Sequence, residues 1–143
     1  MIDVEVLGLA RVAGAPPADE LRRLCASAAA GRGVEQGHVA VAFVDARRIA
    51  QLNGEHRGKA EPTDVLSFPI DGVGAGGAAV GHPTTGTPGG VPVELGDIVI
   101  CPEHTVDLRE AVVHGMLHLL GMDHEHDDGE MLALQAELLG ARR

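Results

Sequence analysis

The sequence has few of the features that mark membrane, secreted or disulfide-stapled proteins. Among its 143 residues are two Phe, two Cys, no Trp and no Tyr, so the core must be built from Ala, Val, Leu and Ile. Apolar runs stay well below the roughly 20 residues of a membrane span. The N-terminal MIDVEVLGLA has no basic cluster of the signal-peptide kind. We therefore expect a cytoplasmic globular protein with no membrane partner, in which Cys25 and Cys101 are buried free thiols.

Basic residues are also scarce. There are 11 Lys and Arg against 21 Asp and Glu, which gives a net charge of −10. This balance excludes a broadly basic nucleic-acid coat, and no DNA partner is expected. An RNA partner would have to meet a local basic surface or arrive within a larger assembly. Four of the eleven basic residues fall within thirteen positions: Arg47, Arg48, Arg57 and Lys59.

Hydrophobic periodicity predicts one α+β domain over 1–143. Strands are expected at 2–9, 38–44, 63–70 and 94–102, and helices at 16–33, 46–58, 105–120 and 128–139. This β-α-β-α-β-β-α-α order predicts a mixed sheet of about four strands packed with helices. Pro69 favours an edge position for its strand or the end of that strand, and Asp45 can cap the helix that follows it. Residues 71–92, rich in Gly, Pro and Thr, predict a long flexible loop.

The most informative stretch is HGMLHLLGMDH at 114–124. On a helix, His114 and His118 lie one turn apart on the same face, where two imidazoles can bind one ion. His124 can join them only if the chain turns back after the helix, and Gly121 stands where such a turn belongs. The spacing therefore predicts a site for one zinc ion, formed by a helix and the turn that follows it.

The donor set favours a catalytic site over a structural one. Three histidines leave one position of a tetrahedral zinc open to activate water, whereas structural sites are closed and thiolate-rich. Asp123, next to His124, can orient a ligand or accept a proton. The alternative is a structural site closed by Asp123 or His126. Gly115 stands where the zinc-protease pattern H-E-x-x-H has its general base.

These residues resemble the signature of the YbeY family, bacterial zinc-dependent endoribonucleases of ribosomal RNA maturation. Two further segments are similar to that family: LNGEHRGKAEPTDVLSFP at 52–69 and ELGDIVICPE at 94–103. The resemblance implies an α+β fold with zinc held by the three histidines. It also implies cleavage of single-stranded RNA near the 3′ end of small-subunit ribosomal RNA, and a part in ribosome quality control.

The resemblance also implies a catalytic arginine. Arg57, in RGK, matches an arginine that the family places in its active-site cleft, and His114, a metal ligand, is expected to be catalytic as well. A guanidinium can hold two phosphate oxygens in a bidentate fork as negative charge develops on them. Lys59 can add a further phosphate contact. Without the resemblance, the sequence would predict that Arg57 is a solvent-exposed arginine after the end of a helix.

Three functions follow as hypotheses. The first is a metal-dependent endoribonuclease in which either water or the ribose 2′-OH attacks the phosphate. The second is a zinc peptidase with metzincin-like histidine spacing, which Gly115 argues against because a peptidase needs a carboxylate base. The third is a non-catalytic ribosome assembly factor with a structural zinc. The acidity of the chain suits docking to basic ribosomal proteins.

Overall fold

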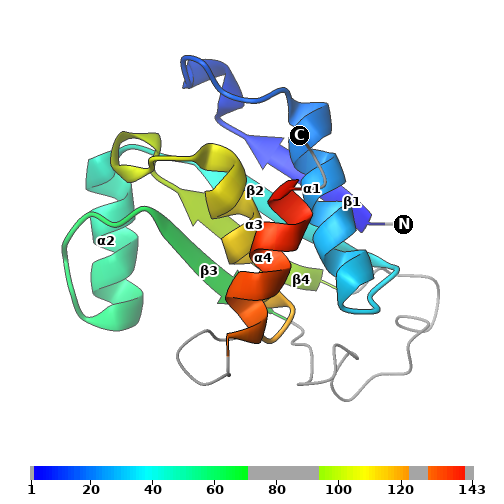
Figure 1. The fold of residues 1–143 in the computed structure, drawn as a ribbon. Coiled ribbons are helices and arrows are strands. Elements are labelled where there is room, and N and C mark those ends of the chain that lie inside the picture. Colours follow the sequence, from blue (N-terminus) through cyan, green and yellow to red (C-terminus); the bar gives the residue numbers. More distant parts are fainter. Residues whose placement is uncertain (1, 71–93, 123–128, 141–143) are drawn as a thin grey trace.

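The computed structural model describes residues 2–70, 94–122 and 129–140 (Figure 1). The predicted loop at 71–92 and the residues Asp123, His124 and His126 lie outside these ranges. The strands are β1 (Ile2–Leu7), β2 (Gly37–Phe43), β3 (Val65–Pro69) and β4 (Glu94–Ile100). The helices are α1 (Ala18–Gly31), α2 (Ala46–Arg57), α3 (Leu108–Leu119) and α4 (Glu130–Gly140), with short 3₁₀ turns at Leu9–Arg11 and Pro102–His104. The predicted order of elements is confirmed.

The four strands form one mixed sheet in the order β1-β2-β4-β3. β1 pairs with β2 and β2 with β4 in parallel, whereas β3 runs antiparallel to β4. β3 is therefore an edge strand. This position confirms the expectation from Pro69, which has no backbone N–H to donate to a second neighbour.

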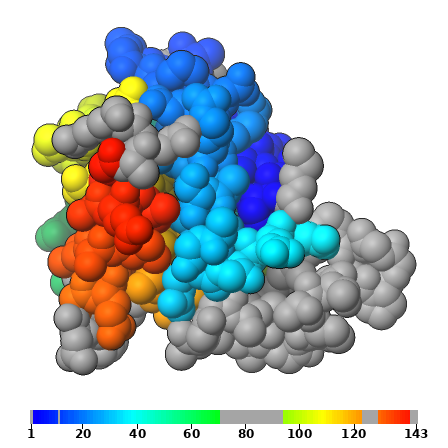
Figure 2. Space-filling model, turned by 45° about the vertical axis from the view of Figure 1, so that its right-hand side comes forward, coloured from blue at the N-terminus to red at the C-terminus, as the bar shows by residue number. Residues whose placement is uncertain are grey.

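The two faces of the sheet are covered differently. Because side chains alternate along a strand, Val39, Val41 and Ile98 point to one face, where the main core forms against α1, α3 and α4. Leu66 and Val99 point to the other face and pack against Ile49 of α2. Figure 2 shows α1 and α4 side by side on the surface.

The cysteines follow this burial pattern. Cys25 belongs to the main core and Cys101 to the smaller cluster beneath α2, and both are free and buried, as predicted. Burial raises the pKa of the Cys25 thiol to about 12. Cys25 is therefore an apolar core residue and not a reactive thiol.

Capping residues fix where the two central helices begin. Asp45 accepts a hydrogen bond from the Arg48 backbone N–H at 2.8 Å, which confirms the predicted cap of α2. Helix α3 begins at Leu108, three residues later than the predicted Thr105. The reason is Asp107, whose carboxylate accepts hydrogen bonds from the backbone N–H groups of Arg109 and Glu110 at 3.0 and 3.3 Å.

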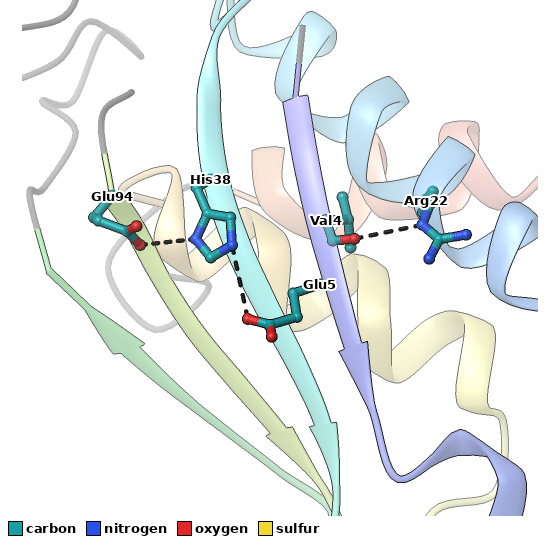
Figure 3. Close-up of polar contacts among 5 residues, drawn as sticks. All are labelled: Val4, Glu5, Arg22, His38 and Glu94. Carbon is teal, nitrogen blue, oxygen red and sulfur yellow. Dashed lines mark hydrogen bonds and ion pairs between the residues drawn. The ribbon is translucent and has the colours of Figure 1, made fainter. Parts of the chain in front are cut away.

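A polar cluster joins three strands across the face of the sheet opposite α1 and α3 (Figure 3). His38 Nδ1 lies 2.9 Å from the Glu94 carboxylate, and its Nε2 lies 3.9 Å from that of Glu5. The hydrogen bond to Glu94 is the main cause that raises the pKa of His38, partial burial opposes it, and the charges of Glu94, Asp3 and Glu5 add to the increase. On the other side of β1, the Arg22 guanidinium of α1 donates to the Val4 carbonyl at 3.4 Å.

Candidate metal centre

Helix α3 presents two histidines from an otherwise buried segment. Between residues 111 and 120, His114 and His118 are the only positions that are not buried. The others pack against α1, α4, β3 and β4, so the backbone beneath the two histidines is held on every side. Their four-residue spacing places both imidazoles on the one face of the helix that is open.

The two imidazoles converge through the same ring atom. The Nε2 atoms of His114 and His118 lie 3.1 Å apart, and the rings meet edge-on with centroids 4.7 Å apart. Two nitrogen ligands of a tetrahedral zinc, each at 2.0–2.1 Å, are separated by about 3.3 Å. The observed spacing therefore fits two ligands of one such ion.

The other ring nitrogen of His114 is bound from a different helix. Its Nδ1 lies 2.8 Å from Oε1 of Gln135 in α4. An amide oxygen only accepts hydrogen bonds, so a hydrogen bond between these two atoms requires the proton on Nδ1. In the neutral imidazole this leaves the lone pair on Nε2, which is the form needed by a metal ligand.

The chain turns immediately after His118. Gly121 has φ of 91°, and the Gly121 and Met122 N–H groups donate to the carbonyls of His118 and Leu117 at 3.1 and 3.0 Å. These two bonds form a Schellman motif, in which a left-handed glycine ends the helix. The predicted turn at Gly121 is confirmed. His124, which this turn was predicted to bring back, lies outside the described residues.

Gly115 marks the closest approach of α3 to the sheet. A Cβ placed on it would lie 2.7 Å from Cγ2 of Ile98 and 3.3 Å from both Ser67 Oγ and Val65 Cγ2. The Ser67 hydroxyl donates to the Gly115 carbonyl at 3.1 Å. The position therefore faces the sheet and leaves no space for any side chain, least of all the glutamate of H-E-x-x-H.

Arg57 and Lys59 stand at the end of α2, and both are exposed. Helix α2 ends at Arg57 because Gly58 adopts a left-handed φ of 74°. Asn53, which is buried, donates from its side-chain amide to the Glu61 carbonyl at 3.0 Å and so holds the segment that carries Lys59. The Arg57 side chain makes no hydrogen bond or ion pair with the other described residues, which leaves its guanidinium available for a ligand.

Edge strand β3 connects the arginine and the histidines. On one face, its Phe68 ring lies 4.4 Å from the ring of His56, the residue before Arg57. On the other face, Ser67 contacts α3 at Gly115. Among the described strands β3 pairs with β4 only, and it contacts the end of α2 on one face of the sheet and α3 on the other.

The complete three-histidine site stays a prediction. Within 2–70, 94–122 and 129–140, no group of three His, Cys, Asp or Glu side chains is placed to hold a metal ion. His114 and His118 supply two ligand positions, and the expected third, His124, is outside those ranges together with Asp123. The chemistry of the described pair fits zinc, since both Nε2 atoms converge and one has its proton fixed on the other nitrogen.

Gln135 was not predicted as part of the site. The sequence feature that could have indicated Gln135 is its place as a polar residue on an apolar helix face. Met131 precedes it by four positions and Leu138 follows it by three. Met131 is fully buried and Leu138 packs against the main core. That spacing predicts a buried partner for Gln135, but only the packing of α4 on α3 identifies that partner as His114.

Comparisons with known proteins identify the family. The family model of Endoribonuclease YbeY matches residues 18–142. The chain is 38% identical to an Endoribonuclease YbeY of Bacillus cytotoxicus, over 85% of this chain and 83% of that protein. It is 40% identical to an Endoribonuclease YbeY of Salinispora tropica, over 78% of each chain. The chain therefore belongs to the Endoribonuclease YbeY family, and the resemblance of its motifs is confirmed.

A solved structure supports the fold. The solution structure of TM1509 from Thermotoga maritima aligns with a TM-score of 0.52 and 25% identity, over 94% of this chain and 85% of that one. The α+β fold with a four-stranded mixed sheet agrees with the prediction.

Proposed function

We propose that the protein is a metal-dependent endoribonuclease that cleaves single-stranded RNA during ribosomal RNA maturation and ribosome quality control. Its relatives carry the name Endoribonuclease YbeY. The observation that carries the proposal is the convergence of the His114 and His118 Nε2 atoms at 3.1 Å on the partly exposed face of α3. His114, His118 and His124 would hold one zinc ion, with Asp123 beside the third ligand. Zinc supplies Lewis acidity toward a phosphodiester.

The other groups act on the substrate itself. A phosphodiester gains negative charge on its oxygens as it approaches the transition state, and a guanidinium stabilises that charge through two parallel hydrogen bonds. Arg57 is exposed and has no partner among the described residues, so it can take this role. Lys59, two residues further along the same segment, can bind a neighbouring phosphate as a point charge. The attacking group is water or the ribose 2′-OH.

The geometry at Gly115 argues against a peptidase. In H-E-x-x-H enzymes the glutamate after the first histidine acts as the general base. Here that position faces Ile98 and Ser67, with less than 3 Å between a built Cβ and Ile98. A carboxylate therefore cannot be placed there, and a peptidase would lack its proton acceptor. The family relationship also disfavours a purely structural zinc protein.

The acidic chain suits a role within an assembly. A net charge of −10 opposes long-range attraction to free RNA and favours docking to basic ribosomal proteins. Helices long and apolar enough to span a membrane are absent from the described ranges. We propose a cytoplasmic protein that meets its RNA on or near the ribosome, with the local basic residues Arg57 and Lys59 at the point of contact.

The proposal is tested with single-stranded RNA and zinc-loaded protein. The wild type should cleave the RNA internally, His114→Ala should lose cleavage together with zinc, and Arg57→Ala should lose cleavage while it keeps zinc. Arg47→Ala, which removes an exposed arginine from the other end of α2, is the matched control and should cleave normally. Equal cleavage by all four proteins would identify a contaminating nuclease and contradict the proposal.

A further inference from the structure

Helix α4 places one polar side chain against the histidine pair. Gln135 is partly buried, and its Oε1 lies 2.8 Å from Nδ1 of His114. The sequence separation is 21 residues, so this bond depends on the packing of α4 against α3. Both residues of this bond, His114 and Gln135, are among the described residues. Residues 123–128, which lie between α3 and α4 in the sequence, are not.

The turn of α4 that precedes Gln135 is anchored by apolar contacts. Met131, one turn earlier, is fully buried in the main core. Leu134, the preceding residue, lies against Gly31 at the end of α1, with its Cδ1 3.5 Å from the position of a Cβ there. These contacts fix the position of the Gln135 backbone relative to His114.

The bond decides which nitrogen of His114 has a free lone pair. A neutral imidazole carries one proton, and either nitrogen can hold it. Because Oε1 of Gln135 accepts at Nδ1, the proton stays there and Nε2 is left unprotonated. Nε2 is also the atom that lies 3.1 Å from Nε2 of His118. The amide therefore orients the ring and sets the tautomer at the same time.

We propose that Gln135 is a positioning residue for the metal centre: its amide oxygen holds His114 as the Nδ1–H tautomer with Nε2 directed toward the ion. The inference rests on the proposed function only in taking His114 as a zinc ligand. The matching role in many metal sites belongs to a carboxylate or a backbone carbonyl. Here a neutral side chain performs it, so no extra negative charge is placed beside a site that must receive a phosphate.

The test measures zinc affinity by competition with a chromophoric chelator, for which no RNA is needed. Gln135→Ala removes the acceptor and should weaken zinc binding by about 10–100-fold, the usual effect of losing such a partner. Gln135→Glu keeps an acceptor oxygen at this position. It should therefore bind zinc with an affinity equal to or higher than that of the wild type. Glu137→Ala, an exposed change on the same helix, is the control and should leave the affinity unchanged.

A second measurement separates positioning from stability. In the zinc-free protein, the imidazole ¹⁵N shifts of His114 should show a protonated Nδ1 in the wild type and a mixture of tautomers in Gln135→Ala. Circular dichroism and thermal unfolding establish that the variants are folded. Should Gln135→Ala perturb unfolding, the ¹⁵N shifts of Gln135→Glu, which keeps the acceptor, still report on the tautomer.

The outcomes distinguish this inference from the proposed activity. If Gln135→Ala and Glu137→Ala bind zinc equally well while His114→Ala does not bind it, the positioning role is wrong and the endoribonuclease proposal stands. If Gln135→Ala loses affinity but the zinc-loaded wild type leaves single-stranded RNA intact, the positioning role stands and the proposed activity fails. A wild type that binds no zinc overturns both.

Discussion

The Ser67 hydroxyl of β3 donates a hydrogen bond to the Gly115 carbonyl of α3 at 3.1 Å. Through this contact the histidine-bearing helix lies directly on the edge strand of the sheet. The approach is possible because residue 115 has no side chain, since Ile98, Ser67 and Val65 occupy the space a Cβ would need. One residue therefore sets the depth of α3 and, with it, the position of His114 and His118.

Replacing this glycine should destabilise the protein. In Gly115→Ala the added methyl meets Ile98 Cγ2 at 2.7 Å, and overpacking of this kind costs about 1–3 kcal/mol. The better helix propensity of Ala returns only about 1 kcal/mol. Because Ile98 is a fully buried, β-branched residue of a central strand, it cannot move away easily, so we expect a net loss of about 1–2 kcal/mol. Urea unfolding measures the change.

The control for Gly115→Ala is Gly140→Ala. Gly140 is also a helical glycine, the exposed last residue of α4, and a Cβ there meets no atom of the described residues within 4 Å. Its replacement should leave the free energy of unfolding equal or slightly higher. A Gly115→Ala protein as stable as the wild type would mean that α3 does not approach the sheet as closely as described.

The turn at Gly121 should matter for zinc more than for stability. A non-glycine residue at φ of 91° is strained, at a cost of roughly 1–2 kcal/mol. Gly33→Ala is the matched control, because Gly33 also has positive φ, 75°, with open space around it. Both variants should lose similar stability in thermal unfolding. Only Gly121→Ala should also lose zinc affinity, since it alters the turn between His118 and His124; equal affinities in the two variants would contradict this role.

The His38–Glu94 contact should make stability depend on pH. The pKa of His38 is raised in the folded protein above its ordinary 6.5, first by the hydrogen bond to Glu94. The stabilisation is therefore fully present below the unfolded pKa of about 6.5 and is lost as the pH rises through the higher folded pKa. Because solvent screens this partly exposed pair, we expect about 0.2–1 kcal/mol. Urea unfolding of wild type and Glu94→Gln at pH 5.5 to 9 measures it.

The test is how the difference in unfolding free energy between wild type and Glu94→Gln changes with pH. The wild type should exceed Glu94→Gln most at the acidic end, with the gap closing toward pH 9. Asp19→Asn, which breaks the exposed Arg22–Asp19 pair at 3.0 Å, should show a constant difference over the same range, because that pair contains no histidine. A gap for Glu94→Gln that widens with rising pH would show that His38 is not protonated in the contact.

Arg57 should act in the transition state and not in folding. Arg57→Ala should reduce kcat for RNA cleavage by about 10²–10³-fold, the effect of removing one charge-stabilising donor. Arg57→Lys keeps the charge but loses the bidentate fork, so it should recover only part of the rate. The unfolding temperature of both should match that of the wild type, because Arg57 is exposed. A variant with normal kcat and a higher KM would assign Arg57 to RNA binding alone.

The elements of the fold were predictable because their signals are local. Alternating Val and Ala in 38–44, the Asp45 cap and Pro69 each specify their own segment, and the structure agrees. The start of α3 was predicted too early because an N-cap at Asp107 competes with the hydrophobic pattern before it. The first residue of a helix depends on which backbone hydrogen bonds form at its start, and these cannot be read from the sequence.

The site was predictable only in part. His114, His118 and Gly121 follow from one short motif, since helix geometry and a left-handed glycine relate them directly. Gln135 and Ser67 contact the same helix from 21 and 48 residues away, by side-chain bonds that exist only after α3, α4 and β3 have packed together. The reason for glycine at 115 likewise lies in Ile98, on a different element. Long-range packing, not local propensity, determines these roles.

Removal and return of the metal tests the central claim most directly. Zinc per chain and internal cleavage of single-stranded RNA are measured on the same wild-type sample before chelation, after chelation and after zinc is added back, with His118→Ala alongside. We predict one zinc per chain, loss of cleavage with the zinc, recovery with its return, and neither binding nor cleavage in His118→Ala. Undiminished cleavage by the zinc-free protein, or by His118→Ala, would contradict a metal centre built on this helix.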